Sequence, residues 1–155
     1  MSADAAAGRL EGGVHILPVR IYYEDTDFSG MVYHANYLRY FERGRSDFLR
    51  LAGMSHAELL ALEAPLAFTI ERIEVDFLRA ARIDDLLTVR TVYSEARGAR
   101  LKALQDIRRD GEEIARARVH AACISLEGRP RRLPRELAER LGPILKDGLP
   151  DMRAG

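Results

Sequence analysis

The most informative stretch of the chain is YEDTDFSGMVYHANY, residues 23–37, in which two acids, a glycine and a histidine lie between an apolar segment and the start of a helix. Residues 19–23 predict a strand, and Gly30 predicts a turn. Asn36 is a candidate N-cap for a helix that runs to about Met54. The first turn of a helix has unpaired N–H groups and carries roughly +0.5 of an elementary charge. An acid beside such donors favours acyl chemistry, because the amides can hold a developing oxyanion.

The ionisable residues of this stretch also have simpler interpretations. Asp25 and Asp27 could be turn formers or caps, which is the usual role of Asp in a loop before a helix. His34 could be a general base, offer its backbone amide to a substrate, or be only a first-turn neighbour. One nitrogen and two acids at loop spacing are weak support for a metal, so we predict neither a metal nor another cofactor. Glu42 lies on the helix among three arginines and is expected in an ion pair.

Length and composition describe a chain of one domain with balanced charge. The 155 residues carry 24 basic and 24 acidic side chains, so no overall field directs the chain to nucleic acid or to an anionic membrane. Cys123 is the only cysteine, which excludes an intrachain disulfide and fits a reducing compartment. No apolar run approaches the ~20 residues of a membrane span, and residues 1–13 lack the apolar core of a signal peptide. We therefore expect a cytoplasmic protein.

The pattern after the long helix predicts one antiparallel sheet. Residues 66–79 alternate in two phases that slip near Arg72, which a β-bulge explains. Asp110-Gly111 predicts a hairpin, and Gly44 on the helix leaves room for close approach to another surface. The fold class is therefore α+β, with one long helix wrapped by a curved antiparallel sheet of about five strands. The expected divisions are a flexible N-terminal segment over residues 1–14, the domain over 15–133, and a tail over 134–155 with a short amphipathic helix.

Several motifs in the first third of the chain resemble those of one enzyme family. VRIYYEDTD at residues 19–27 is followed by Gly30, by VYHANY at 32–37 and by FERGR at 41–45. This pattern resembles the hot-dog-fold acyl-CoA thioesterases. Among them it is most similar to the YbgC type associated with the Tol-Pal system, a relative of the 4-hydroxybenzoyl-CoA thioesterases. The likeness continues more loosely to about Leu133, and it implies the hot-dog fold.

The resemblance implies an acyl-CoA thioesterase that hydrolyses a small or short-to-medium acyl group, carried by CoA or by acyl carrier protein. Its catalytic residues would be Asp27, as the carboxylate, and His34, whose amide would help to bind the thioester carbonyl. Whether Asp27 attacks the acyl carbon or activates a water stays open at this point. The further substrate contacts that we expect are Gly30, Tyr33, Ala35 and Asn36.

Because the net charge is zero, the phosphates of CoA must meet local arginines. We predict Arg97 and Arg100 for this role, with the arginines at 79 and 82 or within 129–132 as alternatives. The family resemblance implies a homodimer or homotetramer with sites at the subunit boundary. Two other functions stay open, namely a non-catalytic module that binds acyl groups or acyl carrier protein, and a hot-dog dehydratase in which His34 and an acid move protons.

Overall fold

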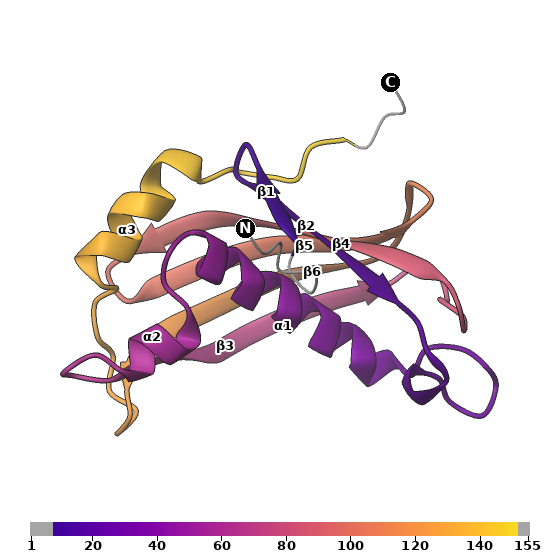
Figure 1. Cartoon of the computed structure of the whole chain (residues 1–155), viewed down its shortest axis with the longest axis horizontal. Coiled ribbons are helices and arrows are strands. Elements are labelled where there is room, and N and C mark those ends of the chain that lie inside the picture. The colour runs from indigo at the N-terminus through magenta and orange to yellow at the C-terminus, as the bar shows by residue number, and fades with distance from the viewer. Residues whose placement is uncertain (1–7, 152–155) are drawn as a thin grey trace, which may run out of the picture.

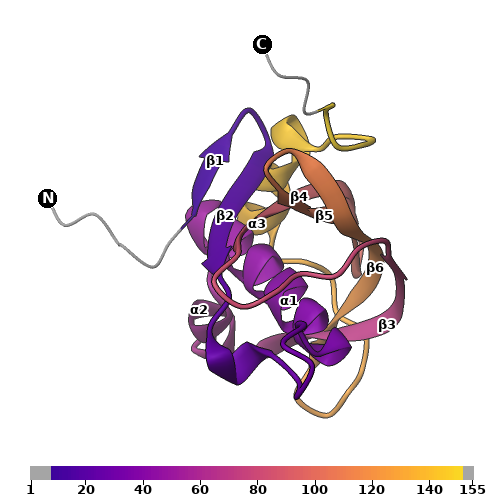
Figure 2. The same cartoon turned by 90° about the vertical axis from the view of Figure 1, so that its right-hand side faces the viewer.

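The computed structural model describes residues 8–151, which form one six-stranded antiparallel sheet with a long helix against one face (Figure 1). The strand order is β1-β2-β4-β5-β6-β3, so β1 and β3 are the edges. Figure 2 shows the sheet curving around α1. The strands are β1 (Arg9–Glu11), β2 (Val14–Arg20), β3 (Leu66–Phe77), β4 (Leu86–Arg97), β5 (Arg100–Arg109) and β6 (Glu112–Ser125). The helices are α1 (His34–Leu51), α2 (His56–Leu60) and α3 (Arg135–Leu141), with 3-10 turns at Tyr23–Asp25 and Gly142–Ile144.

The N-terminal part of the sheet differs from the sequence prediction. The hydrophobic pattern predicts about five strands and a flexible segment over residues 1–14, but β1 is a sixth strand and Val14 begins β2. A strand of three residues is too short for its alternation to stand out, and it is fixed by pairing with β2 rather than by its own sequence. Residues 9–11 and Val14 thus belong to the sheet, while residues 1–7 lie outside the described residues.

Helix α1 lies close to the sheet because Gly44 faces it. A Cβ atom at Gly44 would come within 2.7 Å of Thr91 Oγ1 and 3.1 Å of Val89 Cγ1, so a larger residue would force the helix or the sheet to shift. Phe41 and Phe48, which flank this glycine along the helix, have no exposed surface. The expectation that Gly44 permits close approach is confirmed, and the centre of α1 is fixed over β4 and β5.

Two local signals in the strands are confirmed. The register of β3 on β6 shifts between Ile70 and Arg72, where the hydrophobic alternation changes phase. Asp110 and Gly111 have φ angles of 50° and 81° and form the turn between β5 and β6. β3 is 12 residues long and lies at the edge of the sheet, where β6 is its only strand partner within residues 8–151. Its other edge is therefore open.

The face of the sheet opposite α1 holds a buried ion pair that the C-terminal segment covers. Arg90 and Asp106 are 2% and 1% exposed, and they join through Nε–Oδ1 (2.9 Å) and Nη2–Oδ2 (2.5 Å). After Gly142–Ile144 the chain runs along β4, where the Lys146 N–H donates to the Tyr93 carbonyl (2.9 Å). Further on, Arg90 Nη1 donates to the Pro150 carbonyl (2.6 Å). The guanidinium is thus paired on every side.

The leucine repeat behind Pro134 predicts a short helix, which is present as α3. Leu137 and Leu141 on this helix have no exposed surface, because they pack into the main core. Figure 1 shows α3, in yellow, at the end of the sheet away from the start of α1. In the part of the chain that the structure describes, no helix is both long and apolar enough to cross a membrane.

Candidate active site

The loop between β2 and α1 folds back on itself and carries the predicted acids. Thr26 and Val32 pair as an isolated antiparallel bridge, and the Asp27 N–H donates to the Met31 carbonyl (2.8 Å). Gly30 adopts a φ of +82°, which favours glycine, and its N–H donates to the Asp27 carbonyl (3.1 Å). The backbone thus holds Asp27 at a tight bend. Gly30, predicted as a substrate contact, has a conformational role in making that bend.

Asp25 holds this loop in place. Its carboxylate accepts a hydrogen bond from the Tyr22 N–H (2.8 Å). Its carbonyl accepts two more, from the Tyr33 N–H (3.0 Å) and from Asn36 Nδ2 (2.8 Å). These contacts join the 3-10 turn to the first turn of α1, which supports the interpretation of Asp25 as a structural partner of Asp27.

Helix α1 begins earlier than the sequence predicts. Its first residue is His34, and Tyr33 occupies the N-cap position without a side-chain capping hydrogen bond. The prediction that Asn36 is the N-cap is wrong, because Asn36 lies within the first turn and its side chain donates to the loop carbonyl of Asp25. Within residues 8–151 the N–H groups of His34 and Ala35 have no hydrogen-bond partner. These two amides are therefore available at the positive end of the helix.

The Asp27 side chain is exposed to solvent and ionised at neutral pH. Its Oδ1 accepts hydrogen bonds from the Ser29 hydroxyl and from the Ser29 N–H, the latter at 2.8 Å. These two hydrogen bonds, the hydroxyl first, lower the pKa of Asp27 below its ordinary value. The anionic form is the one that can attack an acyl carbon or accept a proton from water.

Asp27 shares an open cavity of about 360 Å³ with the start of α1. The cavity is lined by Asp27, His34 and Tyr37 on one side, and on the other by Phe77, the last residue of β3, and by Arg79 just after it. The His34 ring meets the Phe77 ring edge-on, with their centroids 6.2 Å apart. The two predicted catalytic residues therefore line one cavity, which brings a carboxylate next to the first residue of α1.

No sequence motif predicts the wall that the end of β3 forms. The Val32 N–H donates to the Ala81 carbonyl (2.8 Å), and the Ala81 N–H donates to the Tyr37 hydroxyl (3.0 Å). These bonds fix the segment after β3 against both the loop and α1. Arg79, on this wall, forms an exposed ion pair with Glu112 (3.3 Å). Its membership of an arginine cluster in a predicted turn is the one sequence signal that points to it.

Arg97 and Arg100, the predicted contacts for CoA phosphates, lie at the turn between β4 and β5. Neither residue lines the Asp27 cavity. Arg100 borders a separate cavity that it shares with Lys102. The phosphate-binding role of this pair stays a prediction, and Arg79 is the arginine of the predicted clusters that does line the cavity.

A family model and known proteins match the chain over most of its length. The model of the Thioesterase-like superfamily matches residues 22–141. The chain is 42% identical to the acyl-CoA thioesterase YbgC of Haemophilus influenzae over 121 residues, which are 77% of this chain and 88% of that protein. It is 37% identical to the acyl-CoA thioester hydrolase YbgC of Escherichia coli, over 77% of this chain and 90% of that protein.

Solved structures have the same architecture. A probable thioesterase from Bartonella henselae superposes with a TM-score of 0.76 at 45% identity, and covers 78% of this chain and 99% of its own. A 1,4-dihydroxy-2-naphthoyl-CoA thioesterase from Synechocystis superposes with a TM-score of 0.77 at 23% identity, over 84% of this chain and 96% of its own, a likeness that shows the fold alone. The chain therefore has the hot-dog fold and belongs to the thioesterase-like superfamily, within its YbgC group of acyl-CoA thioesterases.

Proposed function

We propose that this chain hydrolyses acyl-CoA thioesters and that Asp27 is the reacting carboxylate. The observation that carries the proposal is a single cavity that holds both the ionised Asp27 and the start of α1, where the amides of His34 and Ala35 are unpaired within the described residues. A thioester carbonyl resting on those amides would lie beside Asp27, and its developing negative charge would be stabilised by the helix end. Membership of the family supports thioester hydrolysis as the reaction, and the geometry of the loop supports Asp27 as the residue that carries it out.

Two chemical routes use the same carboxylate. In the first, Asp27 Oδ2 attacks the acyl carbon, the C–S bond breaks, the CoA thiolate leaves and is protonated by solvent, and water then hydrolyses the acyl-Asp27 anhydride. In the second, Asp27 takes a proton from a water that attacks the acyl carbon. The lowered pKa of Asp27 favours the first route, because such a carboxylate stays ionised but is a weak proton acceptor. Trapping with hydroxylamine, followed by mass spectrometry of the Asp27 peptide, distinguishes the two.

A product assay tests the proposed reaction. Acyl groups of small to medium length are supplied on CoA and on acyl carrier protein, and release of the free thiol carrier is expected. A new double bond with the thioester intact would instead identify the dehydratase alternative, and saturable binding without any product would identify a binding module. The same assay tests acyl carrier protein as a carrier. Association with the Tol-Pal system and a cytoplasmic location stay predictions from the sequence.

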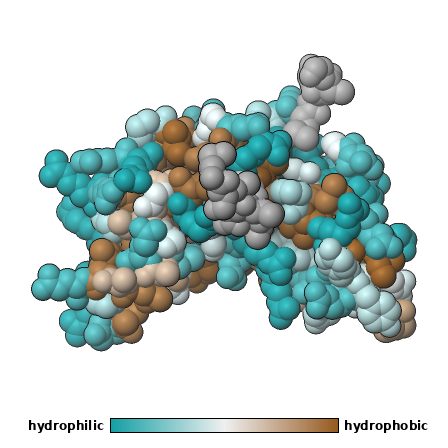
Figure 3. Space-filling model, in the orientation of Figure 1, coloured by the Kyte–Doolittle hydropathy of each residue, from teal (hydrophilic) through white to brown (hydrophobic). Residues whose placement is uncertain are grey.

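We further propose that the site is completed by a second copy of the chain paired along β3. Ile70 and Phe77 on this open-edged strand are 44% and 50% exposed, and Phe77 also lines the Asp27 cavity. Long edge strands with exposed apolar side chains are seldom left unpaired. Figure 3 shows hydrophobic residues, in brown, gathered at the lower left, over α2 and the neighbouring part of β3. Light scattering at assay concentration should give a dimer or tetramer, and a fully active monomer would contradict the proposal.

A further inference from the structure

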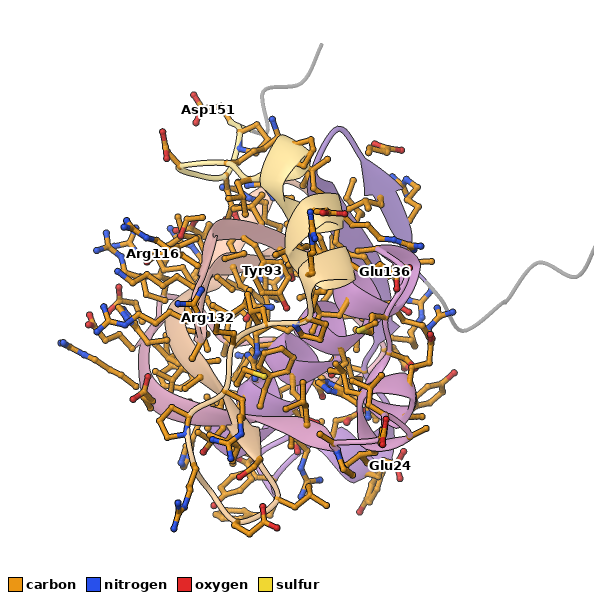
Figure 4. The ribbon with its side chains drawn as sticks, turned by 90° about the vertical axis from the view of Figure 1, so that its left-hand side faces the viewer. Glu24, Tyr93, Arg116, Arg132, Glu136 and Asp151 are labelled. Atoms are coloured by element: carbon orange, nitrogen blue, oxygen red, sulfur yellow. The ribbon has the colours of Figure 1, made fainter. Side chains whose placement is uncertain are left out.

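A second cavity, of about 270 Å³, lies between α1 and the sheet, further along the helix from Asp27. Its walls are mainly apolar and include Leu49, Phe68, Ile70 and Val119. Tyr93 also lines it, and Figure 4 shows Tyr93 inside the molecule while Arg116 points outward. Pockets of this kind suit the non-reacting part of a ligand, with a few polar groups that fix its orientation. The polar and charged residues of its lining, besides Tyr93, are Glu42, Arg45, Ser46 and His56.

Arg45 supplies a positive charge to this cavity, which Glu42 also lines, and within the described residues Arg45 forms no ion pair. Its Nη1 donates to the neutral Gln105 Oε1 (3.0 Å), and within residues 8–151 no carboxylate oxygen lies within 4.0 Å of its guanidinium. Gln105 is itself oriented, because its Nε2 donates to the Phe41 carbonyl and to Thr91 Oγ1, both at 2.8 Å. The guanidinium is thus held in place by one hydrogen bond, and the rest of its five N–H donors have no partner among the described residues.

Glu42 is the acid nearest to Arg45 along the face of the helix, and it attracts the guanidinium without forming an ion pair with it. The predicted ion pair of Glu42 is wrong, because within the described part of the chain no arginine or lysine nitrogen lies within 4.0 Å of its carboxylate. Glu42 is exposed, whereas Arg45 is half-buried; burial lowers the pKa of Arg45, and the nearby Tyr93 and Glu42 only partly offset this effect. A charge withdrawn from water in this way is usually paired, so a ligand anion would complete the arrangement.

The two cavities lie along one stripe of α1. The residues His34, Leu38, Glu42, Arg45 and Leu49 recur at helical spacing, and Arg45 lies about 16 Å from His34 along the helix axis. β3 borders both ends of this stripe, through Phe77 beside His34 and through Phe68 and Ile70 beside Arg45. A long arginine side chain on a helix leans toward the helix N-terminus, which brings the guanidinium closer to Asp27 than its Cα.

We propose that Arg45 binds a carboxylate at the far end of the acyl chain, so that the preferred substrates are CoA thioesters of dicarboxylic acids. The proposal rests on the proposed function for the position of the thioester beside Asp27. The apolar side chains that line the second cavity would hold the methylene chain, and the guanidinium of Arg45 would form a charge-assisted hydrogen bond with the terminal carboxylate. Arg45 is then a specificity-determining residue that takes no part in the chemical step.

Binding of non-hydrolysable thioether analogues tests this inference without relying on turnover. S-alkyl-CoA compounds with six, eight and ten carbons, each with and without a terminal carboxylate, are titrated by calorimetry. At one or more lengths, the carboxylate should tighten binding at least about tenfold. Arg45→Met should abolish that difference and leave binding of the plain alkyl compounds nearly unchanged. Arg43→Met is the matched control, because Arg43 lines a different groove, and it should keep the difference.

A second variant keeps the test decisive if Arg45→Met disturbs the helix. Glu42→Gln removes the neighbouring negative charge and should strengthen the preference for the carboxylate. No preference at any length, or a preference that survives Arg45→Met with Glu42→Gln also without effect, would overturn the inference. Hydrolysis of plain acyl-CoAs without any carboxylate preference would refute this inference alone. Tight binding of the carboxylate analogues with no hydrolysis of any thioester would refute the proposed function alone.

Discussion

The loop before α1 and the buried centre of α1 use their polar groups in opposite ways. In the loop, hydrogen bonds are made mainly by the backbone, and the Asp27 carboxylate and the amides of His34 and Ala35 stay accessible. In the centre, Gln105 is 1% exposed and makes hydrogen bonds to the helix and to the sheet. One helix thus provides a rigid support in its middle and reactive groups at its end. The two regions should respond differently to substitution.

The largest effect that separates the two regions is expected at Asp27. Asp27→Asn should lower thioester hydrolysis at least about a hundredfold, because the neutral amide can neither attack the acyl carbon nor accept a proton. The melting temperature should stay close to that of the wild type, since the side chain is exposed and its hydrogen bonds come from Ser29 and Met31 of its own loop. Steady-state kinetics and thermal unfolding measure the two quantities. Asp25→Asn is the matched control and should impair the chemical step less; near wild-type turnover in Asp27→Asn would sink the assignment.

At Gly44, in contrast to Asp27, we expect substitution to lower stability. Gly44→Val should lower the free energy of unfolding by about 1–3 kcal/mol, because its Cβ atom would lie 2.7 Å from Thr91 Oγ1, closer than real Cβ atoms come, and a tight 3.1 Å from Val89 Cγ1. Urea denaturation gives the measurement. Gly148→Val is a suitable control, since a Cβ atom at Gly148 would meet nothing within 4 Å. Equal stability of the two variants would show that α1 is not seated as closely as described.

Asn36 connects the two regions, and its substitution should affect both stability and activity. Asn36→Ala removes the hydrogen bond from Nδ2 to the Asp25 carbonyl, at a site that is 8% exposed, which should cost about 1 kcal/mol. Since this bond also positions the loop, turnover should fall more than stability alone explains. Thermal unfolding and kinetics on the same samples test this expectation. Normal turnover with lowered stability would show that the hydrogen bond from Asn36 to the loop is not needed for catalysis.

The smallest effect is expected from pH, at His15 beside the buried part of α1. His15 has no exposed surface, its Nε2 meets Asp47 Oδ2 at 2.6 Å, and burial lowers its pKa below the ordinary 6.5. Below about pH 6.5 the unfolded chain therefore binds a proton that the folded protein does not, so stability should be complete above this pH and decline as the pH falls toward the folded-state pKa. His15→Gln, which keeps a donor for Asp47 but does not titrate, should show a weaker decline in melting temperature between about pH 7.5 and 5.5.

The sequence predicts features that depend on neighbouring residues and misses those that depend on tertiary contacts. Gly44, the phase slip at Arg72 and the Asp110-Gly111 turn are visible because helix and strand periodicities are local. Asn36 is wrongly predicted as the N-cap because N-cap preferences depend on residue type alone. They do not include the Asp25 carbonyl, to which the Asn36 side chain donates a hydrogen bond. β1 is missed because its pairing partner, rather than its composition, makes it a strand.

The candidate site divides in the same way. The spacing of Asp27, Gly30 and His34 predicts one side of the cavity, because all three lie in one loop and the helix that follows it. Its other side comes from Phe77 and Arg79, which only the path of β3 brings to this place. Arg90 forms an ion pair and Arg45 forms none within the described residues. A sequence with 22 arginines cannot predict this difference, because it depends on which carboxylates the fold brings close to each guanidinium.

The last described residues are exposed, yet the hydrogen bond from Arg90 to the Pro150 carbonyl makes them part of the cover of a buried ion pair. A protease that trims the chain back past Pro150 removes one acceptor from a guanidinium that is 2% exposed, and uncovers its pair with Asp106. Breaking up a buried charge pair costs far more than losing a surface contact. The pair itself survives the cut, but water then reaches both charges and weakens their attraction, so trimming this tail should lower the stability of the domain.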